Sequence, residues 1–307
     1  MITILMATYN GEKYLPKQID SLLAQTFTDF TIWIQDDVST DNTWQILKVY
    51  QKDHPEKIKI TRRETPSGSA KNNFLDMITT ARDDYIMLCD QDDFWLPNKI
   101  ELTLVKMKEM EVANPSQPIL VHTDLTVVDQ NLQIIQQSFR ISTNRDYNRK
   151  KYRHMFTINN ASGCTIMYNR ALADLLYVTP RYTMMHDWWL KLVATSFGKV
   201  GHIDQQTMLY RQHGENSLGA KDVRTLKYKF NRFLNWQVVR DNIHATCTQA
   251  ASLLECYGDK LSPEQIDFLK QYSIIPSRNK LGRWYTICKL GAFMNGISRN
   301  IAYFTFV

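Results

Sequence analysis

The chain contains few of the residues that mark disordered, collagen-like or disulfide-stabilised proteins. Its 307 residues include only 11 Gly and 9 Pro, against 44% apolar residues, which is an ordinary globular composition. The five cysteines form no CxxC pair and no zinc-ligand spacing: Cys89, Cys164, Cys247, Cys256 and Cys288. Because an odd number of cysteines argues against a closed disulfide framework, a reducing compartment is the simpler interpretation.

Signals for export or membrane insertion are also missing. The N-terminal run MITILMATYN is short and strand-like, and it has neither the basic region nor the longer apolar stretch of a signal peptide. No window approaches the roughly 18 uninterrupted apolar residues of a membrane-spanning helix. We therefore expect a cytoplasmic protein that is soluble or peripheral at the inner face of the cell membrane.

Excess positive charge is absent from most of the chain and concentrated near its end. Met1 to Ala220 carry 24 basic and 25 acidic residues, whereas Lys221 to Val307 carry 13 basic and 6 acidic ones. The last 31 residues contain five basic residues and no acid: Arg278, Lys280, Arg283, Lys289 and Arg299. Such a segment favours an anionic surface, either membrane headgroups or nucleic acid.

Apolar runs alternate with amphipathic ones through the first hundred residues, which predicts strands alternating with helices. The expected strands are 2–7, 31–35, 58–62 and 85–89, and helices are expected at 14–25 and 43–52 and from about Lys71 and Pro97. This pattern predicts an α/β fold with a mainly parallel sheet and flanking helices, whose ligands lie beyond the carboxyl ends of the strands. Only helices are expected after Lys221. We therefore predict two domains, 1–220 and a basic helical region at 221–307.

The predicted helical region ends in an apolar stripe with steps of three and four residues: Ile287, Leu290, Met294, Ile297, Ile301 and Phe304. This spacing is typical of one narrow apolar helix face, although Gly291 and Gly296 weaken a helix there. The stripe has two interpretations of similar weight. It either packs on its own domain or on a twin subunit, or it lies in a membrane interface.

Acidic residues gather at three places where strands are expected to end. Asp36 and Asp37 follow one strand, Asp90, Asp92 and Asp93 follow another, and Asp187 precedes a Trp pair. The carboxyl ends of parallel strands share one crevice, and acids gathered there need a cation or hydrogen-bond donors. The Asp90-Gln91-Asp92 segment is therefore a candidate site for Mg²⁺ or Mn²⁺. Helix capping is the alternative for the first pair and explains the acids after Cys89 poorly.

Several motifs together resemble the family-2 glycosyltransferases, which have the Rossmann-like GT-A fold. They are ILMATYNGEKYL from Ile4, QDDVSTDNTW from Gln35, CDQDDFWLPNK from Cys89, SGCTIMYNR from Ser162, MHDWWLKL from Met185 and YRQHGENSLG from Tyr210. Their order and spacing cover roughly residues 1–220. DQDDFW, HDWW and YRQHGEN are most similar to the bacterial rhamnosyltransferases. Val38 departs from the family, where many relatives have Gly.

The resemblance implies a role for each matching residue in a donor site. Ala7, Thr8 and Tyr9 would line the nucleotide pocket, where Asp37 would accept a hydrogen bond from a uracil or thymine N–H. Asp92 would be the principal ligand of a Mn²⁺ or Mg²⁺ ion that bridges the diphosphate. The remaining implied contacts are Asp90 near the ribose or metal, Asp93 facing the donor sugar, Lys71 near the nucleotide, and Arg211 and His213 at the diphosphate and metal.

The resemblance also makes Asp187 the candidate catalytic base, since the acceptor hydroxyl must lose its proton as it attacks. Several of these residues have structural alternatives. Asp187 is also a plausible helix N-cap, and Trp188 and Trp189 stack on a sugar or belong to the core. A lone histidine such as His213 is more often structural, and Lys71 is equally well a plain helix start.

The resemblance implies an inverting, metal-dependent transfer of L-rhamnose from dTDP-β-L-rhamnose in the synthesis of a bacterial surface polysaccharide. The basic tail without a spanning helix leads us to predict a lipid-linked saccharide at the inner membrane face as the acceptor. A UDP-sugar is the alternative donor, and a sugar-nucleotide-binding protein without turnover is the alternative from another class. A dinucleotide oxidoreductase is disfavoured because MATYNGEK replaces the G-x-G-x-x-G turn. Nucleic acid is not an expected partner, because the basic surplus is separate from the acids. The inner membrane surface and a second subunit remain the candidate partners of the tail.

Overall fold

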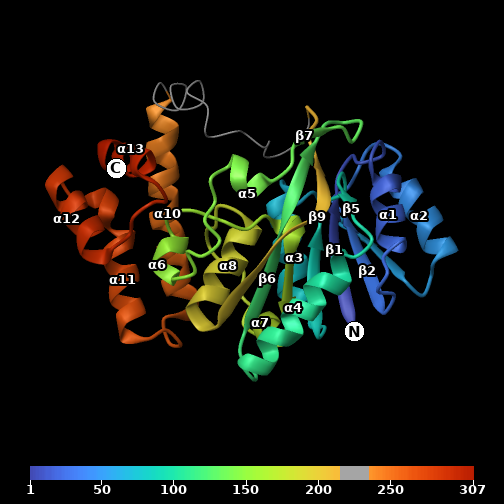
Figure 1. The fold of residues 1–307 in the computed structure, drawn as a ribbon, viewed down its shortest axis with the longest axis horizontal. Coiled ribbons are helices and arrows are strands. Elements are labelled where there is room, and N and C mark those ends of the chain that lie inside the picture. The colour runs from blue at the N-terminus through green and yellow to red at the C-terminus, as the bar shows by residue number, and fades with distance from the viewer. Residues whose placement is uncertain (215–234) are drawn as a thin grey trace. The chain divides into compact units, whose positions relative to one another are not determined.

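The computed structural model describes residues 1–214 and 235–307, which form two compact units that interleave along the chain (Figure 1). The first unit consists of Met1–Phe139, Ala161–Thr179 and the described part of Gly198–Ala220. The second consists of Arg140–Asn160, Pro180–Phe197 and the described part of Lys221–Val307. The expected boundary between Ala220 and Lys221 lies outside the described residues, and the division at that point stays a prediction.

The first unit is built on a nine-stranded sheet in the order β3-β2-β1-β4-β8-β6-β9-β5, with β7 paired to β6. The strands are β1 (Ile2–Thr8), β2 (Phe30–Asp36), β3 (Ile58–Arg62), β4 (Tyr85–Cys89), β5 (Phe94–Trp95), β6 (Ile119–Val128), β7 (Ile134–Gln136), β8 (Ile166–Asn169) and β9 (Lys199–Arg211). β1 pairs in parallel with both β2 and β4, and β2 pairs in parallel with β3. The carboxyl ends of β1, β2 and β4 therefore share one edge of the sheet.

The sheet is mixed beyond β4. β8 runs antiparallel to β4 and β6, β5 and β7 are also antiparallel to their partners, and β6 and β9 are parallel. The predicted α/β sheet with flanking helices is confirmed. The antiparallel strands depart from the predicted alternation of parallel strands and helices. They pair residues far apart in the chain, so the local pattern of apolar residues contains no signal for them.

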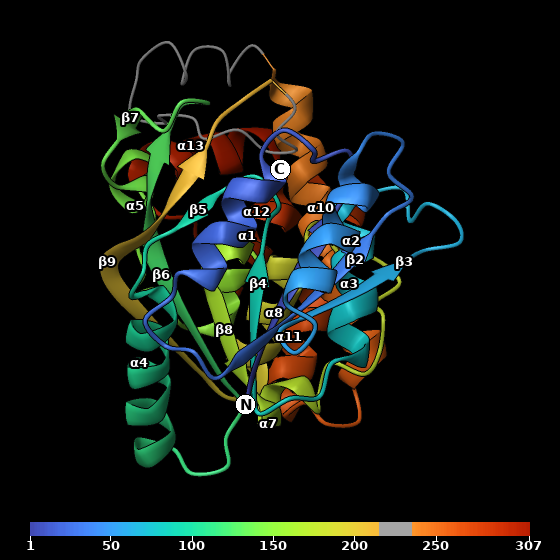
Figure 2. The ribbon, with the colours of Figure 1, turned by 90° about the vertical axis from the view of Figure 1, so that its right-hand side faces the viewer.

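Helices cover the sheet of the first unit (Figure 2). They are α1 (Leu15–Leu23), α2 (Thr43–Asp53), α3 (Ala70–Thr80), α4 (Lys99–Ala113), the short α7 (Arg170–Ala173) and the 3-10 turn η1 (Gly163–Thr165). α2 packs against β3, α3 against β1, and α4 against β6 and β9. α1 has a proline in its first turn, where no N–H is needed. Ser69 caps α3 by accepting a hydrogen bond from the Asn72 N–H.

The second unit is helical in its described residues. It holds α6 (Tyr152–Met155), α8 (His186–Phe197), α10 (Trp236–Tyr257), α11 (Pro263–Ser273), η2 (Ile275–Ser277), α12 (Lys280–Leu290) and α13 (Ile297–Phe306), while α5 (Phe139–Ser142) begins at the last residue of the first unit's first segment. α10 packs against α11 and α13. Within residues 1–214 and 235–307, no helix combines the length and the apolar character that crossing a bilayer requires.

The apolar stripe of the tail does not form one helix face, so this expectation is wrong. Gly291 ends α12 in the left-handed conformation, with φ +61°, and Gly296 precedes α13 with φ +87°. Both values suit glycine, which has no Cβ to clash. The resulting turn buries Ile287 in the unit and leaves Ile297 exposed.

The core of the first unit contains a buried lysine at the start of α4. Lys99 is fully buried, its Nζ donates to Thr207 Oγ1 at 3.2 Å, and the ammonium lies 4.6 Å from the centre of the Trp95 ring. Burial disfavours the charged form and lowers the pKa of Lys99 from 10.5 to about 8. The nearby carboxyl of Asp93 and the thiols of Cys89 and Cys164 oppose this shift.

We predict that Lys99→Met stabilises the protein more at pH 7 than at pH 10. Below pH 8 the lysine is charged in both states, and its buried charge destabilises the fold by on the order of 3 kcal/mol. Between pH 8 and about 10.4 the unfolded chain binds the extra proton, so the wild type recovers this stability as the pH rises. Urea unfolding of the wild type and the variant at both pH values measures the difference.

Lys106→Met, on an exposed part of the same helix, is the matched control and should show almost no change of this kind. If Lys99→Met stabilises the protein equally at pH 7 and pH 10, burial does not lower the pKa of Lys99 as described.

Candidate active site

The parallel strands place the predicted donor residues along one edge of the first unit's sheet. Thr8, the last residue of β1, lies opposite Asp36, the last residue of β2, and the Asp37 N–H donates to the Thr8 carbonyl at 2.8 Å. On the other side of β1, Met6 lies opposite Cys89, so that Asp90 follows at the same edge. Ala7 and Thr8 are buried, whereas Tyr9 is exposed.

The two acids after β2 have different surroundings. Asp36 is fully buried, accepts hydrogen bonds from the Ser39 N–H and hydroxyl, and pairs with Arg62 at 3.2 Å. Asp37 accepts from the Ser67 N–H at 2.6 Å and from the Ser67 hydroxyl at 2.7 Å. Asp36 thus fixes the turn, and Asp37 lies beside the loop that leads to Lys71 near the start of α3.

Val38 occupies a backbone conformation that suits glycine. Its φ is +61°, in the left-handed region, where a residue with a Cβ costs roughly 1–2 kcal/mol. The turn forms here without a glycine, and Ser39 and Arg62 hold the Asp36 carboxylate that precedes it.

Gln91, between the two predicted metal ligands, ties two loops together. Its Oε1 accepts from the Tyr9 N–H, and its Nε2 donates to the Tyr9 carbonyl, both at 2.9 Å. A Cβ on Gly11 would lie 2.3 Å from the Gln91 Oε1, so the glycine makes room for this side chain. These two hydrogen bonds were not predicted from the sequence, where the only indication of them is the amide residue at the centre of Asp-Gln-Asp.

The acids after β4 meet the end of β9. Asp92 Oδ2 lies 2.7 Å from His213 Nε2, and both side chains are largely buried. Asp93 is fully buried and accepts a hydrogen bond from the Arg211 backbone N–H at 3.1 Å. Burial, followed by the like charges of Asp92 and Asp90, raises the pKa of Asp93 well above its usual range.

Arg211 holds the segment that contains Asp92 and Asp93 by hydrogen bonds. It is 1% exposed, its Nε donates to the Asp92 carbonyl at 2.7 Å, and a second nitrogen donates to the Gln130 carbonyl at 2.8 Å. Its guanidinium also lies 4.8 Å from the centre of the Tyr14 ring. These contacts make Arg211 a positioning residue for Asp92 and Asp93, and a source of compensating positive charge.

The cluster fits a hard divalent cation better than a soft one. Ligand atoms of Asp90, Asp93 and Cys164 lie within 4.8 Å of one another, but burial raises the pKa of the Cys164 thiol well above its usual range. A protonated thiol is a poor ligand. The carboxylate oxygens of Asp92 and Asp90 are ligands that suit Mn²⁺ or Mg²⁺, and the His213 nitrogen lies beside Asp92.

The predicted base and the tryptophan pair belong to α8 of the second unit. Asp187 is half-buried at the start of the helix. The Trp188 Nε1 donates to the Met155 carbonyl at 2.6 Å. Trp189 is 1% exposed with its ring centre 6.1 Å from that of Tyr257. This position supports the core alternative for Trp189, whereas Trp188 is half-buried.

Two further buried bases flank Asp187 on α8. Burial lowers the pKa of His186 and lowers that of Lys191 well below its usual range, while the charge of Asp187 opposes both shifts. The Lys191 Nζ also donates to Asn160 Oδ1.

Comparison with known proteins gives a consistent pattern. The family model described as "Glycosyl transferase family 2" matches residues 3–176. Over 239 residues the chain is 29% identical to "dTDP-rhamnosyl transferase RfbG" of Shigella flexneri, a match that covers 73% of this chain and 77% of that protein. It is also 28% identical over 226 residues to chondroitin synthase of Escherichia coli, which covers 71% of this chain but 30% of that protein.

Solved structures resemble the fold at low sequence identity. S. aureus TarS 1–349 in complex with UDP-GlcNAc has a TM-score of 0.55 and 16% identity, with 95% of this chain and 92% of that chain covered. The mannosyltransferase PcManGT from Pyrobaculum calidifontis in complex with GDP-Man and Mn²⁺ has a TM-score of 0.50 and 13% identity, with 99% and 78% covered. These similarities confirm the predicted GT-A-like architecture.

We predict that Gly11→Ala and Gln91→Ala are coupled. Either change removes the two hydrogen bonds between Gln91 and Tyr9, so each should lower the free energy of unfolding by about 1–2 kcal/mol. In the double variant the Gln91 side chain is already absent, so the methyl group of alanine at position 11 displaces nothing. Gly11→Ala should then add almost no further loss in the free energy of unfolding. Urea unfolding of the four proteins in the cycle measures the coupling, and strictly additive losses contradict it.

Proposed function

The chain belongs to glycosyl transferase family 2, and from this membership we propose that it transfers L-rhamnose from dTDP-β-L-rhamnose to a lipid-linked saccharide. The similarity to the dTDP-rhamnosyl transferase of Shigella flexneri, over most of both chains, supports this donor. The observation that carries the proposal is the meeting of Asp92 and His213 at 2.7 Å, at the edge where Asp37 and Asp90 also lie.

The nucleotide of the donor binds at the ends of β1 and β2. The Asp37 carboxylate has two oxygens with about four acceptor positions, of which Ser67 uses two, and the Arg63 Nε lies 3.6 Å from Oδ1. It therefore retains capacity for the N–H of a thymine or uracil base. Ala7, Thr8 and Tyr9 border this position, and Lys71 lies in the first turn of α3 beyond Ser67.

The diphosphate binds beside the acidic cluster. Enzymes of this family and fold generally depend on a divalent metal, and Asp92 and His213, with Asp90, would hold Mn²⁺ or Mg²⁺ here. When bound, the ion neutralises the charge that builds on the departing nucleoside diphosphate. In this proposal the fully buried Asp93 lies behind the donor-sugar position, and Arg211 keeps Asp92 and Asp93 in place.

Asp187 acts as the base on the acceptor. Its carboxylate takes the proton of the attacking hydroxyl, while the oxygen forms a bond to the anomeric carbon and the bond to the diphosphate breaks. One direct displacement inverts the anomeric centre, so a β-linked donor yields an α-L-rhamnoside. Trp188, which is half-buried next to Asp187, borders the acceptor.

The acceptor is a lipid-linked saccharide, reached at the inner membrane surface by the basic C-terminal residues. Residues 221–307 contain 13 basic and 6 acidic residues, which supports an anionic surface as the partner of this region. A homodimer through the same residues is the alternative for the tail.

A UDP-sugar transferase is the second candidate. It is favoured by the likeness of the fold to TarS in complex with UDP-GlcNAc. Release of dTDP from dTDP-β-L-rhamnose, compared with release of UDP from UDP-GlcNAc, distinguishes the two donors. The rhamnosyl proposal expects dTDP release to be the faster, and the reverse order contradicts it.

We predict that Asp187→Asn lowers kcat by about 10²–10⁴-fold and leaves donor affinity unchanged, because an amide cannot take the proton. Steady-state transfer assays and calorimetry with dTDP measure the two quantities. Asp267→Asn, at an exposed carboxyl of the same unit, is the matched control with normal turnover. Normal transfer by Asp187→Asn makes the base assignment wrong.

We predict that Asp92→Ala weakens dTDP binding in Mn²⁺ by about 100-fold or more, because the variant lacks the carboxylate that would hold the cation beside the diphosphate. Calorimetry in Mn²⁺ and in EDTA measures the loss. Binding in EDTA should be equally weak for the wild type and the variant, and unchanged binding in Mn²⁺ contradicts the assignment.

A further inference from the structure

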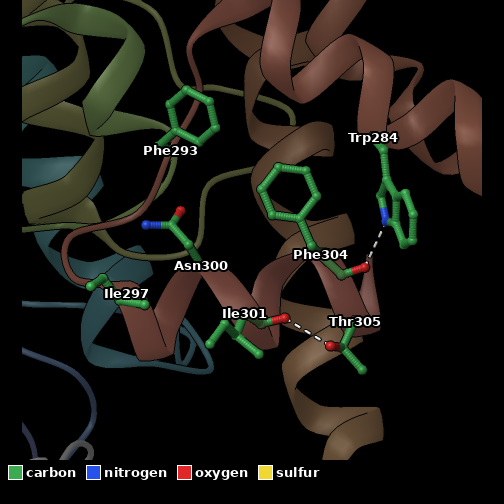
Figure 3. Close-up of a pocket in the computed structure, with 7 residues that line it drawn as sticks. All are labelled: Trp284, Phe293, Ile297, Asn300, Ile301, Phe304 and Thr305. Atoms are coloured by element: carbon green, nitrogen blue, oxygen red, sulfur yellow. Dashed lines mark hydrogen bonds between the residues drawn. The ribbon is translucent and has the colours of Figure 1, made fainter.

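An open apolar groove lies between α12 and α13 of the second unit (Figure 3). Its volume is about 570 Å³, within the range of small-molecule sites. The lining residues are Trp284, Phe293, Ile297, Asn300, Ile301, Phe304 and Thr305. The Phe304 ring lies between those of Phe293 and Trp284, with ring centres 6.3 Å from each.

Hydrogen bonds join the elements that line the groove. The Trp284 Nε1 donates to the Phe304 carbonyl at 2.7 Å, which joins α12 to α13. Asn300 donates to the Met294 carbonyl and accepts from the Met294 N–H, which fixes the turn before α13. Because the walls are held by hydrogen bonds, the groove does not depend on a ligand for its shape.

The rim of the groove exposes large apolar side chains to solvent. Ile297 is 83% exposed and Ile301 is 64% exposed, on successive turns of α13. Trp284 and Phe293 are also exposed in part. In the described residues this is a continuous apolar surface, which is typical of a contact site for a lipid or a protein.

One end of the groove carries a positive charge. The Lys280 Nζ lies 5.8 Å from the centre of the Trp284 ring and donates to the carbonyl of Thr305 near the end of α13. No acidic residue occurs from Ser277 to Val307. The groove thus combines an apolar trough with a cationic end, which matches an amphiphile with an anionic headgroup.

We propose that α12 and α13, the C-terminal hairpin, form a docking site for an anionic phospholipid surface, with an acyl chain in the groove and a headgroup phosphate at Lys280. Ile297 and Ile301 would enter the interface from α13, which is about 15 Å long. This inference rests on the proposed membrane-side function and specifies the element that reaches the membrane.

Charge argues against a second copy of the chain as the occupant. In a two-fold dimer the same surface meets itself, so two hairpins that carry only basic charged residues would face each other without an acidic partner. Like charges brought together in this way disfavour association. An anionic bilayer supplies the missing negative charge.

Vesicle flotation tests the proposal on the full chain. The wild type should float with phosphatidylglycerol vesicles and much less with phosphatidylcholine vesicles. Ile297→Glu/Ile301→Glu should reduce the floated fraction by about ten-fold or more, because two apolar side chains no longer enter the interface. Lys280→Gln should lower the preference for phosphatidylglycerol. Thermal unfolding confirms that each variant is folded.

Val112→Glu is the matched control, since Val112 is also 83% exposed but lies on α4 of the first unit. It should float like the wild type. Equal flotation of Ile297→Glu/Ile301→Glu and the wild type overturns the proposal, as does an equal loss in Val112→Glu. The proposal is also overturned if the wild type is a dimer that does not float and if Ile297→Glu/Ile301→Glu makes it monomeric. That result would identify a second copy of the chain as the occupant of the groove.

Calorimetry with dTDP and Mn²⁺ on the same proteins separates this inference from the proposed function. Retained dTDP binding with lost flotation in the double variant supports the docking site. A wild type that floats but binds no nucleotide makes the proposed function wrong and leaves the docking site standing.

Discussion

The repulsion among three carboxylates at the end of one strand is the constraint on which the site depends. Asp90, Asp92 and Asp93 follow β4 within four residues, and the charges of the first two help to raise the pKa of the buried third. Such a cluster is stable only with compensating donors. Arg211 and His213 supply them from the end of β9, far away in the sequence.

This constraint also explains why the surrounding loops are so firmly connected. Gln91 fastens the segment of acids to the Tyr9 backbone, and Ser39 and Arg62 hold Asp36 under the turn that carries Asp37. Val38 remains in a left-handed conformation within that turn. The hydrogen bonds of Asp36 offset the strain and keep Asp37 at the edge of the sheet, where we propose that the donor nucleotide binds.

Local patterns in the sequence predicted the elements of the first unit well. β1, β2, β3 and β4 lie within a residue or two of the expected ranges, because alternation and turn residues are local signals. The antiparallel pairing of β8 and the contact of Asp92 with His213 depend on residues far apart in the chain, which periodicity does not reveal. For Asp92 and His213, the indication came from the motif resemblance. The residues proposed for the donor site came from motifs in the sequence and stay a prediction, whereas the two hydrogen bonds between Gln91 and Tyr9 could not be predicted.

The C-terminal residues show the limit of periodicity more clearly. Six apolar residues at helical spacing suggested one continuous face, but two glycines with positive φ divide it into α12 and α13. Ile287 and Leu290 turn inward, while Ile297 and Ile301 remain exposed beside the groove. A glycine that breaks a helix changes which side chains share a face, and the apolar pattern alone does not contain that information.

A calorimetric titration of the wild type with dTDP and UDP, each in Mn²⁺ and in EDTA, tests the central claim that the sheet edge of the first unit is a metal-dependent nucleotide-sugar site. The account predicts that dTDP binds in Mn²⁺, binds more tightly than UDP, and loses its affinity in EDTA. The absence of binding by both nucleotides, or binding that is equal in Mn²⁺ and EDTA, would contradict it.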